Sequence, residues 1–88
     1  MKKVVIKEIN DYDYTLVDND NKTYVKNIEF YSEYKPCVGD IIYLDDSILN
    51  TVNIYSFDEI YDASKAKKED IIKVISKDKE YYFQRSFG

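Results

Sequence analysis

Apolar and polar residues alternate over the first third of the chain, as they do in half-buried β-strands. The segment 3–9 is rich in β-branched residues, and Val4 and Ile6 lie on one face of the strand that it predicts. Ile9 falls out of phase with them, which predicts a β-bulge near residues 7–8.

Two more strands are predicted at 12–18 and 22–30, separated by the sequence Asp-Asn-Asp-Asn at 18–21. Asp and Asn tolerate left-handed backbone conformations and bond their own backbone, so this sequence predicts a tight turn. Three strands with such short connections predict an antiparallel meander. The alternation places the following residues on the core side: Tyr12, Tyr14, Leu16, Tyr24, Ile28 and Phe30.

The only proline, the only cysteine and one of the two glycines lie together at 36–40, in the sequence Pro-Cys-Val-Gly-Asp. Pro36 cannot donate a backbone hydrogen bond, and Gly39 can take a positive φ that other residues resist. Asp40 can accept bonds from nearby amides. The segment therefore predicts a sharp turn into a buried strand at 41–44, with Cys37 as a small turn residue.

The second half of the chain predicts helical pieces and a closing hairpin. Residues 45–49 fit one helical turn capped by Asp45 or Asp46. Ser56 and Glu59 fit a capping box, which predicts a helix over 57–67. Segments 70–76 and 80–85 flank a Lys-Asp-Lys turn and predict two paired strands.

These elements predict one domain, 1–88, that is mostly β: a small antiparallel β-barrel with one short helix or helical insertion. The meander followed by the Pro-x-Val-Gly-Asp turn, within residues 2–44, resembles small OB-fold barrels, particularly cold-shock-like domains. The same turn also opens strands in SH3-like barrels, so both topologies remain open. The resemblance implies a binding role rather than catalysis, by analogy of fold.

The resemblance also implies a place for nucleic acid. Members of the family that bind it carry aromatic residues on the exposed face of the second and third strands, where Tyr12, Tyr14 and Tyr24 are the candidates here. Their phase with Leu16 and Ile28 favours the core instead.

The residue content argues against most enzymes. The chain has no histidine and one cysteine, which removes the commonest general base, an activated thiol and an ordinary zinc site. The 18–29 segment superficially fits a calcium loop, but Lys22 and Thr23 occupy positions that need a ligand and a glycine. We expect no cofactor and no enzyme activity, although paired-carboxylate chemistry stays open because acidic residues are plentiful.

The cysteine count and the length of the apolar runs indicate the cellular compartment. A single cysteine favours a reducing compartment, and no apolar run approaches the roughly 18 residues of a membrane helix. We therefore expect a cytoplasmic protein that does not enter a membrane.

The formal net charge of −4 is unevenly spread. Residues 36–62 carry six acidic and no basic side chains, whereas 63–88 carry seven basic and four acidic ones. The pattern fits either ordinary solvated faces or a charge-polarised binding surface. For nucleic acid, the best phosphate contacts would be Lys65, Lys67 and Lys68, but an acidic protein disfavours that partner.

Ten tyrosines exceed what a core of this size can hide. Either some lie at an interface, where tyrosine is enriched, or tyrosine simply replaces other apolar residues in an AT-rich coding sequence. Tyr81 and Phe83 share one face of the last strand and are predicted in the core. Tyr82 would then be exposed and, with Arg85 and Phe87, would form an aromatic–Arg cluster. The predicted function is non-catalytic protein–protein interaction or self-association; the alternative is single-stranded nucleic-acid binding through an OB-type face.

Overall fold

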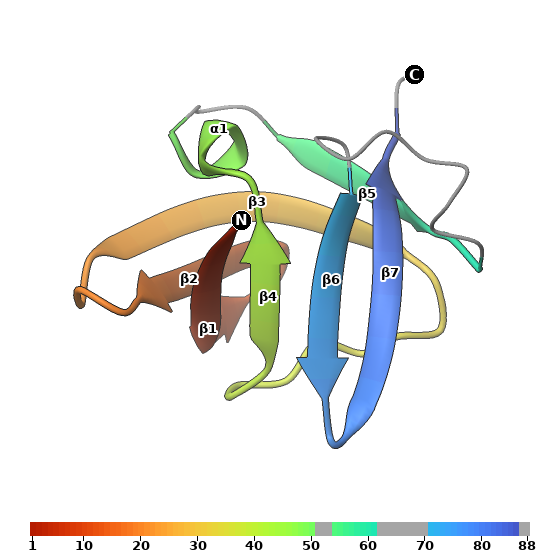
Figure 1. Ribbon diagram of the computed structural model, residues 1–88, viewed down its shortest axis with the longest axis horizontal. Coiled ribbons are helices and arrows are strands. Elements are labelled where there is room, and N and C mark those ends of the chain that lie inside the picture. Colours follow the sequence, from red (N-terminus) through yellow and green to blue (C-terminus); the bar gives the residue numbers. More distant parts are fainter. Residues whose placement is uncertain (51–53, 62–70, 87–88) are drawn as a thin grey trace.

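The computed structural model describes residues 1–50, 54–61 and 71–86. These residues form one closed barrel in the order β1–β2–β3–β5–β7–β6–β4, with very little helix (Figure 1). The predicted small, mostly β-barrel is confirmed. The elements are β1 (Lys2–Asn10), β2 (Asp13–Asp18), β3 (Thr23–Tyr31), β4 (Ile41–Leu44), α1 (Asp46–Leu49), β5 (Tyr55–Glu59), β6 (Ile71–Ser76) and β7 (Lys79–Arg85).

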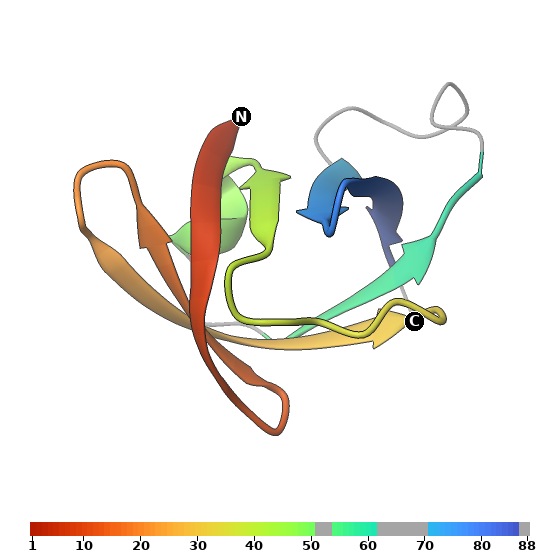
Figure 2. The ribbon, with the colours of Figure 1, turned by 90° about the horizontal axis from the view of Figure 1, so that it is seen from below.

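The predicted meander is present, with β1 antiparallel to β2 and β2 antiparallel to β3. The β1–β2 register shifts between Ile6 and Glu8, where the bulge was predicted. Strand β4 pairs with β6 on one side and, on the other, with the first part of β1, from Lys2 to Val5. The remainder of β1 runs past β4 before it turns into β2 (Figure 2).

The 36–40 segment forms the predicted sharp turn. Gly39 has a φ of 98°, a conformation that residues with a β-carbon resist. The Gly39 N–H donates to the carbonyl of Ile6 (2.8 Å), and the Ile6 N–H donates to the carbonyl of Asp40 (3.0 Å). The turn is thus bonded to β1 and directs the chain into β4.

The helix predicted over 57–67 is wrong at its start, because Tyr55–Glu59 is strand β5. This strand pairs in parallel with β3 and antiparallel with β7, and its Tyr55 and Phe57 are buried. Backbone pairing on both sides outweighs a local capping sequence. Residues 62–67 of the predicted helix lie outside the described residues.

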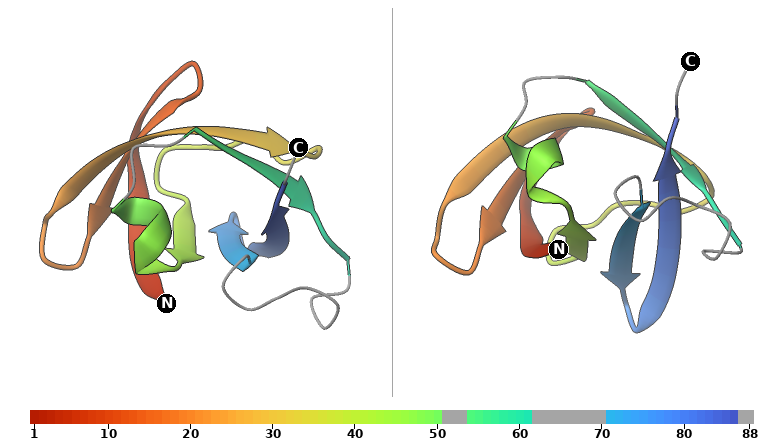
Figure 3. Two further views of the ribbon diagram at one scale, coloured as in Figure 1. Left: turned by 90° about the horizontal axis from the view of Figure 1, so that it is seen from above. Right: turned by 45° about the horizontal axis from the view of Figure 1, so that its top comes forward.

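A shorter helix, α1, follows β4 directly and matches the predicted turn at 45–49 (Figure 3). The side chain of Asp45 accepts a hydrogen bond from the Ser47 N–H (2.9 Å), so Asp45 is the N-cap. Ile48 and Leu49 are buried and join the core.

The closing hairpin is β6–β7. Lys77 and Asp78 form its two-residue turn with φ of 51° and 66°, as a type I′ hairpin turn requires. Phe83 is fully buried, as predicted, and Tyr81 is half-buried against the core.

The core contains most of the residues that alternation placed there, but not Tyr12. Tyr14, Leu16, Tyr24 and Ile28 are buried, and Phe30 packs against them. Tyr12 is 58% exposed, because β2 begins one residue later and Tyr12 lies in the turn before it.

Candidate functional site

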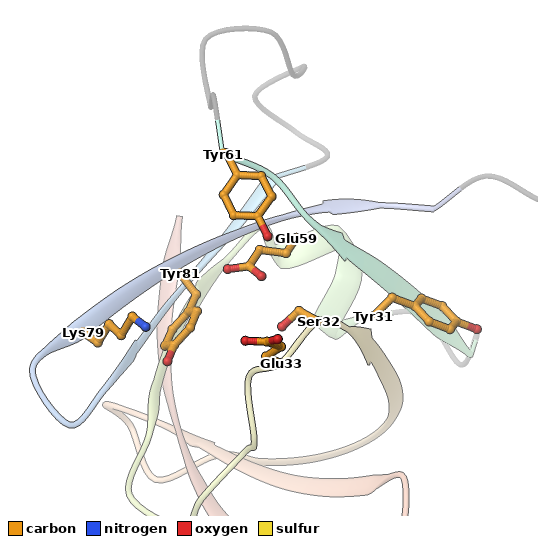
Figure 4. A pocket seen from close by; sticks show the side chains of 7 residues that line it. All are labelled: Tyr31, Ser32, Glu33, Glu59, Tyr61, Lys79 and Tyr81. Carbon is orange, nitrogen blue, oxygen red and sulfur yellow. The ribbon is translucent and has the colours of Figure 1, made fainter.

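The inward-facing residues of β3, β5 and β7 change from aromatic to polar at one end of the barrel. On the core side, Phe30, Phe57 and Phe83 lie on the three strands. Beyond these rings the surface of the barrel has a pocket of about 550 Å³, a volume within the usual range for ligand sites. We call this pocket the mouth; it is lined by Tyr31, Ser32, Glu33, Glu59, Tyr61, Lys79 and Tyr81 (Figure 4).

Packed aromatic rings of the core lie next to the mouth. The ring centroids of Phe30 and Phe83 are 5.0 Å apart, and those of Phe30 and Tyr34 are 5.3 Å apart. Tyr34 in turn contacts Tyr81 of the mouth, with centroids 4.9 Å apart. Such contacts favour fixed ring orientations. Phe30, Tyr34, Phe57 and Phe83 thus form a firmly packed aromatic cluster of the core, joined to the mouth through Tyr81, and we call this cluster the floor.

The floor is connected to the glycine-containing turn through Tyr34. Its buried hydroxyl donates to Asp40 Oδ2 (2.6 Å), and the Cys37 N–H donates to the same oxygen (2.9 Å). Burial and then the Asp40 carboxylate raise the pKa of Tyr34 far above its ordinary value, so the phenol stays protonated. The turn therefore positions a ring beneath the mouth.

Two carboxylates and one ring dominate the mouth. Figure 4 shows the side chains of Glu33 and Glu59 and the ring of Tyr81 facing the same space. Among the described residues, neither glutamate side chain has a hydrogen bond or an ion pair. The hydroxyl of Tyr31 instead donates to Glu29 (2.6 Å), and its ring points away from the centre.

Lysines gather on the neighbouring side of Tyr81. A second pocket, of about 310 Å³, shares Glu33, Lys79 and Tyr81 with the mouth and adds Tyr34, Lys35, Ser76 and Lys77. The ammonium of Lys79 lies 5.2 Å from the Tyr81 ring centroid. The surface thus changes from acidic to basic across Tyr81, so the two sides of this ring favour ligand groups of opposite charge.

Two of the three tyrosines that were candidates for an OB-type nucleic-acid surface on the second and third strands are buried. Tyr14 and Tyr24 are 5% and 8% exposed, so neither ring is free to stack on a base. The hydroxyl of Tyr24 donates to Asp18 (3.2 Å) inside the barrel. Of the three candidates, only Tyr12 is exposed.

The predicted binding residues are only partly described. Tyr82 lies on the outer face of β7, where its hydroxyl contacts Glu80 (3.3 Å) and the Lys73 ammonium lies 6.0 Å from its ring centroid. The guanidinium of Arg85 lies 4.7 Å from the ring centroid of buried Tyr55, so the structure does not bring Tyr82 and Arg85 together. The remaining predicted residues, Lys65, Lys67, Lys68 and Phe87, lie outside the described residues.

Sequence reasoning missed the mouth. Its residues come from the end of β3, the end of β5 and the start of β7, so no local motif contains them. One signal was present: Tyr55, Phe57, Glu59 and Tyr61 occupy every second position, which is the period of a strand. Treating the segment as a helix hid that pattern.

The described residues were also searched for a metal site and for a membrane-spanning helix. They contain no group of three or more His, Cys, Asp or Glu side chains placed to hold a metal ion, and no helix of membrane-spanning length and hydropathy. Comparison with protein-family models found no match, and the searches of curated proteins and of solved structures found none either.

Proposed function

We propose that this protein is a non-catalytic binding domain whose partner is another protein, and that the mouth is its binding surface. The observation that carries the proposal is an exposed tyrosine beside a firm aromatic floor: Tyr61 is 93% exposed at the rim. Tyrosine is enriched at the energetic centres of protein interfaces, and a preorganised floor lowers the entropy lost on binding.

The charges of the mouth favour a polypeptide over a nucleic acid. Glu33 and Glu59 would repel a phosphate backbone, which supplies most of the affinity in nucleic-acid binding. A polypeptide segment can instead present a charge of either sign at each position. The net charge of −4 also disfavours a nucleic acid.

Single-stranded nucleic acid remains the second candidate because of the basic side of Tyr81. Lys35, Lys77 and Lys79 line one pocket together with that ring, which is the combination of cation and stacking surface that single strands use. The proposed relation to OB-fold barrels concerns only the meander and the turn, since this barrel has more strands than the five of that fold.

The proposal includes the absence of catalysis and a cytoplasmic location. The chain has no histidine to activate a nucleophile, and Cys37 donates weakly to the Lys35 carbonyl (3.4 Å) within its turn, which supports a non-catalytic role. The single cysteine supports a reducing compartment.

Site-specific photo-cross-linking in cells tests the proposal. A benzophenone amino acid replaces Tyr61 at the mouth or, as the matched control, Tyr12, which is also exposed but lies outside the mouth. We expect a discrete protein adduct from position 61 and none from position 12. The adduct should disappear when Tyr81→Ala or Glu59→Lys is added.

The mass of the adduct separates the remaining possibilities. A dimer of this chain would make the partner a second copy, which also supports protein binding. Equal cross-linking from both positions, or a nuclease-sensitive adduct, would contradict the proposal; the latter would promote the nucleic-acid alternative.

A further inference from the structure

Among the described residues, half of β7 has a neighbouring strand on one side only. It pairs with β6 from Lys79 to Gln84, all of its length except the last residue, but with β5 only from Phe83 to Arg85. The last bond between β5 and β7 runs from the Ile60 N–H to the Tyr82 carbonyl (2.9 Å). Among the described residues, no strand continues along β7 beyond that point.

On this edge of β7, the backbone N–H and C=O of Glu80 are the groups that a further strand would meet. In an antiparallel strand, backbone groups point to alternate sides, so Glu80 presents its N–H and C=O on the same edge as Tyr82. No backbone bond from the described residues reaches Glu80 on that side. An extended chain placed there would continue the β5 position of the barrel.

The mouth lies beside this edge of β7. The chain that leaves β5 bends at Tyr61, before it would come to lie opposite Glu80. The mouth is lined by Lys79 and Tyr81 on the β7 side and by Ser32 and Glu33 on the opposite side (Figure 4). An unpaired strand edge beside a lined pocket is the arrangement used in β-strand addition, where the backbone supplies affinity and the pocket selects a side chain.

The lining indicates which side chain enters. It offers two carboxylates without partners among the described residues, the rings of Tyr61 and Tyr81, and one ammonium, while the ring of Tyr31 points away. Carboxylates bind guanidinium groups through paired hydrogen bonds, and tyrosine rings attract cations. Arginine satisfies both better than lysine because its charged group is planar and weakly hydrated.

We infer that the mouth binds an extended segment of a partner protein, which adds as a strand to the Glu80 edge of β7 and places an arginine between Glu33 and Glu59. The inference rests on the proposed function and names the kind of segment that the same site takes. The hydrogen bonds of Glu80 give affinity without selecting a sequence, and the two glutamates select the basic residue.

Peptide titration tests the inference with the intact chain. The probe is a short blocked peptide of alternating Thr and Val with a central Arg, and its control carries Gln at the centre. We expect the Arg peptide to bind at least about tenfold more tightly, as a charge-assisted pair provides. Glu59→Gln or Glu33→Gln should reduce that ratio, whereas Glu8→Gln, far from the mouth on β1, should leave it unchanged.

The strand geometry has a separate readout. On binding, the Glu80 amide should exchange its hydrogen more slowly in NMR spectra, because it gains a partner. A peptide that is N-methylated on the residues facing β7 should bind more weakly than its parent.

Equal affinity for the Arg and Gln peptides, or binding that leaves Glu80 exchange unchanged, would overturn the inference. These comparisons change the peptide and not the protein, so a misfolded variant cannot imitate the result. If the peptides fail but position 61 still cross-links to a protein, the proposed function stands and only the strand-addition inference falls.

Discussion

The two ends of β3 both carry acidic side chains close to tyrosines, but their hydrogen bonding differs. At the hairpin end, Asp18 accepts the N–H groups of Asp20 and Lys22 (2.9 Å each) and the hydroxyl of Tyr24 (3.2 Å). Lys2 adds an ion pair to Asp18 at 3.5 Å. At the mouth, Glu33 and Glu59 have no such partners among the described residues.

This difference separates a structural carboxylate from one that is available to a ligand. Burial alone raises the pKa of Asp18, but the amides of Lys22 and Asp20 and the side chains of Tyr24 and Lys2 together lower it below its ordinary value. Its acceptor capacity is used within the fold. The carboxylates of the mouth keep theirs, and the aromatic floor beneath holds the surrounding surface in shape.

The largest expected effect comes from removing the floor. Phe83→Ala should lower the free energy of unfolding by about 3–5 kcal/mol, because Phe83 is fully buried and large-to-small core changes leave a cavity. Urea denaturation measures it. Tyr82→Ala, one residue away on the outer face, should cost much less; the reverse order would show that the strand register is wrong.

The turn that positions Tyr34 should be next in importance. Gly39→Val should destabilise by roughly 1–3 kcal/mol, because a β-branched residue is strained at a positive φ. Nothing lies within 4 Å of a β-carbon added there, so strain and not collision is the cause. Val38→Ala is the control, since Val38 is 63% exposed. Equal thermal melting of wild type and Gly39→Val would refute the role of the turn.

Acid sensitivity should distinguish the two ends of β3. Since the folded pKa of Asp18 lies below its unfolded value of about 3.9, its stabilisation is present above that pH and is lost as the pH falls through the folded pKa. Asp18→Asn should therefore be less stable near neutrality and should lose less stability on acidification. Unfolding curves from neutral to acidic pH measure this; a wild-type slope in Asp18→Asn would contradict the comparison.

The smallest expected effect on stability is at the mouth. Glu59→Gln should change the free energy of unfolding by no more than about 0.5 kcal/mol, because its carboxylate has no partner to lose among the described residues. The same variant should weaken binding of the arginine peptide. A clear loss of stability by denaturation would mean that Glu59 serves the fold, as Asp18 does.

Several elements were predictable because their causes are local. The meander, the bulge before Glu8, the Asp45 cap and the β6–β7 turn each follow from a few adjacent residues. The buried state of Phe83 follows from alternation along one strand. Tyr12 failed the same rule, because its strand begins one residue later than the alternation implied.

The sequence by itself determined a small β-rich barrel, a glycine-dependent turn and a chain poor in catalytic groups. The tertiary structure alone decided that Tyr55–Glu59 is a strand, because its partners are β3 and β7, far away in the sequence. The same pairing brings Glu33, Glu59 and Tyr81 around one pocket. Local propensity acts between neighbours, whereas the mouth exists only once closure of the barrel has placed three distant segments side by side.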